Sequence, residues 1–139
     1  MGFPATPAIT VDCVAVDADG RLLLIRRGRP PFEGHYALPG GFVDIGETVE
    51  AACRRELEEE TGIVAHELRL AGVYSDPKRD PRGHTVSVVF LTRVADRAPP
   101  PRAGDDAAAA EWVEDWSALP LAFDHARILA DVLPDPSRR

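Results

Sequence analysis

The chain has 139 residues, 45% of them apolar and 28% charged, with a formal net charge of −7. This size predicts one domain, residues 1–139, with an ordinary globular core. The acidic balance, with no basic stripe, argues against a nucleic-acid partner. No apolar run approaches the roughly 18 residues that a membrane span needs, and no secretory signal pattern opens the chain. We therefore expect a cytoplasmic protein without a membrane partner.

The first half of the chain predicts a hairpin followed by a loop and a helix. Alternating apolar residues over 9–16 and a leucine-rich run over 21–26 indicate two strands, joined by the turn Asp19-Gly20. Residues 27–34 contain prolines and glycines and form a loop, after which residues 36–39 run extended into Gly40-Gly41. A helix is expected from Glu47 to Thr61, ended by Gly62 as a left-handed cap.

The second half alternates strands and loops before a last helix. The expected segments are a strand at 67–74, a polar loop at 75–84, a strand at 85–94, a connection at 95–110, a short strand at 111–113, a helix at 123–133 and a disordered tail at 134–139. Too few helices separate the strands for a doubly wound sheet, so the order predicts a mixed α/β fold. Both cysteines, Cys13 and Cys53, are expected to be reduced and buried.

The helix at 47–61 carries acidic residues on the wrong face. Four apolar residues share one side of its helical wheel: Val49, Ala52, Cys53 and Leu57. Glu56 and Glu60 fall near the middle of that side, and Glu59 falls at its edge. Carboxylates that point toward a core need a cation, and a hard divalent metal is the simplest one that satisfies three of them.

The spacing around this helix resembles a known family. Five residues follow Gly41 before Glu47, seven more lead to Arg55-Glu56-Leu57, and single residues separate these from Glu59-Glu60 and then from Gly62-Ile63. This stretch resembles the Nudix (MutT-like) box with every specified position filled. The first hairpin, the Leu38-Pro39 lead-in and the last helix also resemble the family, which implies an α/β/α sandwich around a mixed, curved sheet.

The resemblance implies metal-dependent hydrolysis of a nucleoside diphosphate linked to another group, with Mg²⁺ or Mn²⁺ as cofactor. It makes Glu56, Glu59 and Glu60 the metal ligands, aided by the backbone carbonyl of Gly41. It also implies that Arg55 holds Glu47 in place. Oxygen ligands at i, i+3 and i+4 share one helix face, which suits a metal that completes its shell with water and substrate phosphate.

The loop 75–84 resembles the ADP-ribose pyrophosphatase branch, in which a proline often follows the box by about fifteen residues, as Pro77 does here. Arg79 and Arg82 are expected to bind phosphate, although pairing with the loop aspartates is an equally good interpretation. His84 is a weaker candidate for substrate contact, with a structural hydrogen bond as the alternative.

Two further residues are candidates for substrate contact. Arg27 faces either phosphate or solvent at a strand end. Tyr36 lies either near the base or packed under the box loop. The remaining histidines (His35, His66 and His125) show no ligand spacing and are expected at the surface or in capping roles.

The sequence does not identify a single residue as the general base. Asp106, in a loop that could reach the site, is a candidate from the later part of the chain, together with Asp105 and Glu111. Glu56 or Glu60 could instead double as base.

The leading hypothesis is hydrolysis of ADP-ribose to AMP and ribose 5-phosphate. The alternatives are a Nudix enzyme acting on modified nucleoside triphosphates or on another sugar nucleotide, and a non-catalytic ADP-ribose sensor. The resemblance also implies a homodimer, because relatives often pair.

Overall fold

The computed structural model of the protein describes residues 2–95, 100–104 and 106–133. The expected tail at 134–139 lies outside these ranges. The elements are β1 (Ala8–Val16), β2 (Leu22–Arg27), β3 (Tyr36–Ala37), β4 (Gly40–Phe42), α1 (Val49–Thr61), β5 (Arg69–Tyr74), β6 (Thr85–Arg93), β7 (Ala107–Val113), a 3-10 turn (Trp116–Ala118) and α2 (His125–Val132).

The strands form one mixed sheet with β1 at its centre. β1 runs parallel to β6 along its whole length, from the pair Ala8 and Thr85 to the pair Val16 and Arg93. β2 lies antiparallel to β1 but pairs with it only at Val16, so the other half of that β1 edge is taken by the short strand β4. This insertion places the glycines of β4 beside Asp12 in the middle of the sheet.

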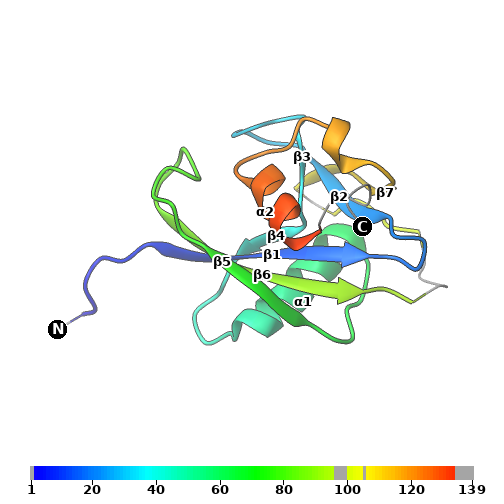
Figure 1. Cartoon of the computed structure of the whole chain (residues 1–139). Helices are drawn as coiled ribbons and strands as arrows, with labels where there is room; N and C mark the ends of the chain where they lie inside the picture. Colours follow the sequence, from blue (N-terminus) through cyan, green and yellow to red (C-terminus); the bar gives the residue numbers. More distant parts are fainter. Residues whose placement is uncertain (1, 96–99, 105, 134–139) are drawn as a thin grey trace.

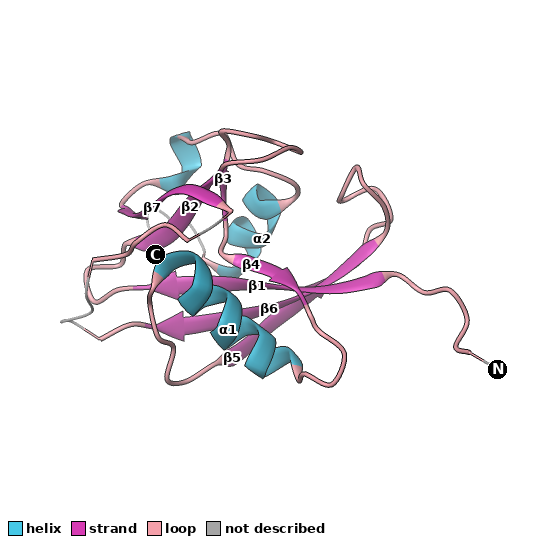
Figure 2. Cartoon of the chain, turned by 180° about the vertical axis from the view of Figure 1, so that it is seen from behind, coloured by secondary structure: helices cyan, strands magenta, loops and turns pink. Residues whose placement is uncertain are grey.

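The two helices cover opposite faces of the sheet, with α2 nearer the viewer in Figure 1 and α1 nearer in Figure 2. Strand side chains point alternately to the two faces, so β1 contributes to both cores. Val11, Cys13 and Ala15 pack against α1. Val14 and Val16 pack against α2. The expected sandwich of helix, mixed sheet and helix is confirmed, and both cysteines are free and buried.

Among the element boundaries that differ from the sequence prediction, three have a clear physical reason. α1 begins at Val49, two residues late, because Thr48 is its N-cap and Glu47 turns back to meet Arg55. α2 begins at His125, because Phe123 adopts a left-handed φ of 52°.

The third difference concerns β7, which begins at Ala107 rather than at residue 111. Alanine has weak strand propensity, so this segment resembled a connection. Its pairing with β2, for example Ile25 with Ala110, makes it a strand.

Candidate active site

Local signals fix both ends of helix α1. Thr48 Oγ1 accepts a hydrogen bond from the Ala51 N–H at 3.0 Å, which caps the N-terminus. At the other end Gly62 has φ 74° and donates its N–H to the Glu58 carbonyl at 2.8 Å. With its ends defined, the helix presents Glu56 and Glu60, one turn apart, toward β4.

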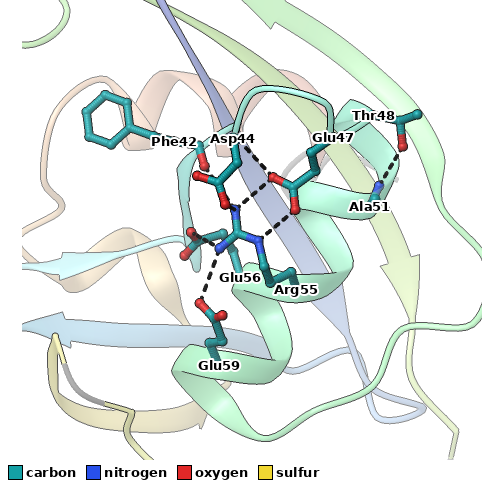
Figure 3. A network of polar contacts seen from close by, with 8 residues as sticks. All are labelled: Phe42, Asp44, Glu47, Thr48, Ala51, Arg55, Glu56 and Glu59. Atoms are coloured by element: carbon teal, nitrogen blue, oxygen red, sulfur yellow. Dashed lines mark hydrogen bonds and ion pairs between the residues drawn. The ribbon is translucent and has the colours of Figure 1, made fainter.

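Arg55 is the centre of the polar network shown in Figure 3. Its Nε and Nη2 donate to the two carboxylate oxygens of Glu47 at 2.7 and 2.9 Å, a bidentate pair. Its Nη1 donates to Glu56 at 2.8 Å and to Glu59 at 3.2 Å. The hydrogen bond from Arg55, aided by the Asp44 N–H, lowers the pKa of Glu47 to about 2. The expected pairing of Arg55 with Glu47 is thus present, and it extends to two of the candidate metal ligands.

Glu56 and Glu60 converge on the glycines of β4. A Cβ on Gly41 would lie 2.6 Å from the Glu56 carboxylate, so only glycine permits this approach. Glu60 Oε2 accepts from the Gly40 N–H at 3.3 Å. Burial, followed by the charge of Glu56, raises the pKa of Glu60 to about 8. Burial also raises the pKa of Glu56, against the opposing effect of Arg55.

Glu59 lies apart from these two carboxylates. Its side chain is 60% exposed, and its carboxylate lies 3.2 Å from Arg55 Nη1. Within the described ranges, no three His, Cys, Asp or Glu side chains are already grouped to hold a metal. Glu56, Glu60 and the adjacent backbone of Gly41 nevertheless fit a hard divalent ion, because partly buried carboxylates with raised pKa values favour a nearby cation and supply only oxygen.

Glu60 and the glycines of β4 line a small cavity, and two arginines, Arg27 and Arg82, also line it. The guanidinium carbon of Arg27 lies 5.0 Å from the centre of the Phe123 ring. That of Arg82 lies 5.6 Å from the Phe42 ring and 5.7 Å from the Phe123 ring. Arg82 donates a hydrogen bond to Asp80 at 2.8 Å. It therefore pairs with a loop aspartate, as one of the two sequence interpretations expected, and it also lines the cavity. The lining of the cavity thus combines carboxylates, among them Glu60, with guanidinium groups.

Arg79 is more deeply buried than expected for a phosphate-binding side chain. Its side chain is 4% exposed and forms a bidentate pair with Asp124 at 2.8 and 3.0 Å. It also donates to Thr85 at 2.8 Å and lies 3.7 Å from Asp12. Arg79 borders the cavity, but its polar atoms are occupied by these partners.

His125 corrects an expectation, since it is buried at 3% exposure rather than lying at the surface. Its Nδ1 accepts the Leu38 N–H at 3.0 Å, and its Nε2 lies 3.4 Å from Asp12. An accepting Nδ1 carries no proton, which places the proton on Nε2, facing Asp12. The ring therefore ties the lead-in to β4 to the centre of the sheet.

Asp12 was not among the site residues predicted from the sequence. Its pKa is lowered although burial alone would raise it, because His125, Ser87 and Arg79 favour the carboxylate. The available signal was one acidic residue within the apolar run of β1. His125 carried no comparable signal.

The remaining candidates lie away from the cavity lining. Tyr36 packs on the core beneath α2. His84 Nε2 lies 2.9 Å from the Ser75 carbonyl. Asp106 is exposed and lies 3.3 Å from Arg29, although its charge contributes to the raised pKa of Glu60. Asp105 falls outside the described residues.

The sequence model of the NUDIX domain matches residues 6–134. The chain belongs to the Nudix family. An "ADP-ribose pyrophosphatase" from Methanocaldococcus jannaschii is 50% identical over 128 residues, which cover 91% of this chain and 73% of that protein. The "ADPR responsive transcriptional repressor NtrR" from Acinetobacter baylyi is 35% identical, covering 89% of this chain and 52% of the repressor.

The Nudix fold is also shared with solved structures. The NUDIX domain of Shewanella oneidensis NrtR, solved with ADP ribose, superposes with a TM-score of 0.83 at 28% identity, covering 91% of this chain and 86% of that one. The family and fold predicted from the box are therefore confirmed. No helix in the described part of the chain is long and apolar enough to cross a membrane.

Proposed function

We propose that the protein is a divalent-metal-dependent pyrophosphohydrolase that cleaves ADP-ribose to AMP and ribose 5-phosphate. The observation that carries this proposal is the pair of partly buried carboxylates, Glu56 and Glu60, set against Gly40 and Gly41 in an intact box. The similarity to an ADP-ribose pyrophosphatase over 91% of the chain supports the choice of substrate.

The metal site we propose consists of Glu56, Glu60 and the Gly41 carbonyl, with Glu59 as a further ligand. We favour Mg²⁺, with Mn²⁺ as a substitute, because all these donors are oxygens. A bound ion would neutralise the pyrophosphate and acidify a water molecule. Arg55 positions Glu56 and Glu59 through its hydrogen bonds, and Glu47 orients Arg55 in turn.

Arg27 and Arg82 are the proposed phosphate contacts from this chain. Both line the same cavity as Glu60, where their planar donors can orient the non-bridging oxygens. Arg79 is assigned a different role, because Asp124 and Thr85 already engage its donors. For the general base, Asp106 remains our candidate outside the box, with Glu56 or Glu60 as the alternative within it.

A substrate panel with Mg²⁺ tests the proposal. ADP-ribose, other nucleotide sugars, dGTP and 8-oxo-dGTP are supplied at equal concentration, and release of AMP and ribose 5-phosphate is followed. We expect ADP-ribose to give the highest kcat/KM. Turnover of a triphosphate at an equal or higher rate would overturn the choice of substrate while leaving the Nudix chemistry intact.

A non-catalytic ADP-ribose sensor is the second candidate, favoured by the similarity to a repressor. Binding of ADP-ribose with no turnover under any metal would support it. The homodimer, the cytoplasmic location and the lack of a nucleic-acid partner stay predictions. Sedimentation and DNA-binding measurements test the first and the third.

A further inference from the structure

The segment that leads into β4 is held by residues that lie just before α2 and at its start. The Tyr36 N–H donates to the Pro120 carbonyl at 2.9 Å, and the Tyr36 carbonyl accepts the Ala122 N–H at 2.8 Å. Two residues further along, the Leu38 N–H donates at 3.0 Å to Nδ1 of His125. Because the chain turns into α2 at this point, an imidazole takes the place of the next backbone acceptor.

This hydrogen bond lies in the interior, where water cannot replace it. Leu38 and His125 are both buried. A buried backbone N–H that loses its acceptor keeps the full cost of its desolvation. The backbone would therefore shift until the donor found another partner. The position of the Leu38 backbone thus depends on the imidazole.

The same imidazole also reaches the residue against which Gly40 packs. Its Nε2 lies 3.4 Å from Asp12 Oδ1, and the hydroxyl of Ser87 donates to the other oxygen of Asp12. Asp12 pairs with Gly40 across β1 and β4, and a Cβ on Gly40 would lie 2.7 Å from Asp12 Oδ1. His125 therefore contacts both the lead-in to β4 and the carboxylate beside it.

Strand β4 in turn carries the backbone groups of the candidate metal site. The Gly40 N–H donates to Glu60 Oε2 at 3.3 Å, and the next residue, Gly41, supplies the proposed carbonyl ligand. Only Pro39 separates Leu38 from Gly40, so a shift of the Leu38 backbone is passed on to both glycines. The geometry of the metal site is thus linked to the start of α2.

We propose that His125 is a positioning residue of the metal site. It fixes the backbone that leads into β4, so that the Gly40 N–H meets Glu60 and the Gly41 backbone stays beside Glu56. His125 borders the same cavity as Glu60, but both of its ring nitrogens already have protein partners, so it acts through the backbone and not on substrate. The inference rests on the proposed metal site and is independent of which nucleotide is cleaved.

Three substitutions of His125 separate its two contacts. Asparagine can place an acceptor where Nδ1 lies, so His125→Asn keeps the bond from Leu38 and loses the contact with Asp12. Glutamine can place a donor where Nε2 lies, so His125→Gln keeps only the contact with Asp12. His125→Leu removes both contacts. Circular dichroism and urea denaturation establish that each variant is folded before metal binding is measured.

Binding of Mn²⁺ without nucleotide is measured from the EPR signal of the free ion. We expect His125→Leu and His125→Gln to bind Mn²⁺ about tenfold more weakly than wild type, as is typical when the support of a metal ligand is lost. His125→Asn should bind almost as tightly as wild type. The control is Leu129→Ala, which opens a cavity at a fully buried position of the same helix and removes no hydrogen bond. It should lower stability and leave Mn²⁺ affinity unchanged.

The comparison of variants decides the role of His125. Unchanged Mn²⁺ affinity in His125→Gln would overturn it, and so would equal weakening in His125→Asn or in Leu129→Ala. If His125→Leu does not fold, the glutamine and asparagine variants still give the answer. A wild-type protein that binds no Mn²⁺ would overturn both the metal site and this role. If the expected pattern of Mn²⁺ affinities is found but ADP-ribose is not hydrolysed, the proposed activity fails and the role of His125 stands.

Discussion

Two arginines organise the carboxylates around this site in contrasting ways. Arg55 is 27% exposed and collects Glu47, Glu56 and Glu59, all within eight residues of it. Arg79 is 4% exposed and collects Asp12 and Asp124 from opposite ends of the chain. The first network comes from one helix and the turn before it, whereas the second joins β1, the loop 75–84 and the start of α2.

The two networks therefore have different roles, one in the candidate site and the other in the stability of the fold. Water partly screens the Arg55 network, so its contribution to folding is modest and its value lies in placing the candidate metal ligands. The Arg79 network is desolvated, so each of its charges depends on the others. The same residue types therefore position ligands in one region and hold the fold together in the other.

Removing the buried arginine gives the largest expected effect on stability. Arg79→Met leaves Asp12 and Asp124 without their cation and should lower the free energy of unfolding by about 3–5 kcal/mol. The matched variant Arg55→Met should cost about 1 kcal/mol but abolish most activity. Urea denaturation of the metal-free proteins measures the loss of stability in both variants. Equal losses of stability would contradict the contrast between the two networks.

Neutralising one carboxylate tests the ligand role of the box. Glu60→Gln should lower kcat for ADP-ribose about 10²- to 10³-fold, the effect of losing several kcal/mol of metal-dependent stabilisation. The fold should persist, since glutamine can still accept the Gly40 N–H. Glu58→Gln, on the exposed face of the same helix, is the control and should remain active. An active Glu60→Gln enzyme would refute the assignment.

The raised pKa of Glu60 predicts a pH-dependent stability in the absence of metal. Its pKa of about 8 lies above the usual 4.5, so the folded state binds this proton more tightly than the unfolded state. That contribution is complete below pH 4.5 and is lost as the pH rises to 8. Glu60→Gln should thus gain stability over wild type, by a few kcal/mol, between pH 5 and pH 8.5. Thermal melts in EDTA at several pH values measure the difference in stability between the two proteins. A difference that does not change with pH would contradict the prediction.

A smaller effect shows that the local helix also depends on a distant segment. The N–H groups of Arg102 and Gly104 donate to the carbonyls of Thr61 and Glu60 at 2.8 and 2.9 Å. A Cβ on Gly104 would lie 1.9 Å from the Glu59 carbonyl oxygen. Gly104→Ala should therefore cost about 1–3 kcal/mol and disturb the end of α1. Gly83→Ala, where a Cβ meets no atom within 4 Å, is the control for thermal melts.

The box was predictable because its information is local. The spacing from Gly41 to Ile63 predicted the helix, its cap at Gly62, and the family. Helical periodicity also placed Glu56 and Glu60 toward the core, and the structure shows both partly buried beside β4. The exact start of α1 was less predictable, because Thr48 and Glu47 are both suited to a first turn.

The rest of the site came only from tertiary structure. Sequence patterns do not show that Asp12, Arg79 and His125 meet, because the parallel pairing of β1 with β6 and the docking of α2 bring them together. Likewise the alanines of β7 become a strand only beside β2. Short-range geometry follows from backbone periodicity, whereas a buried charge finds its partner only when the chain has closed around it.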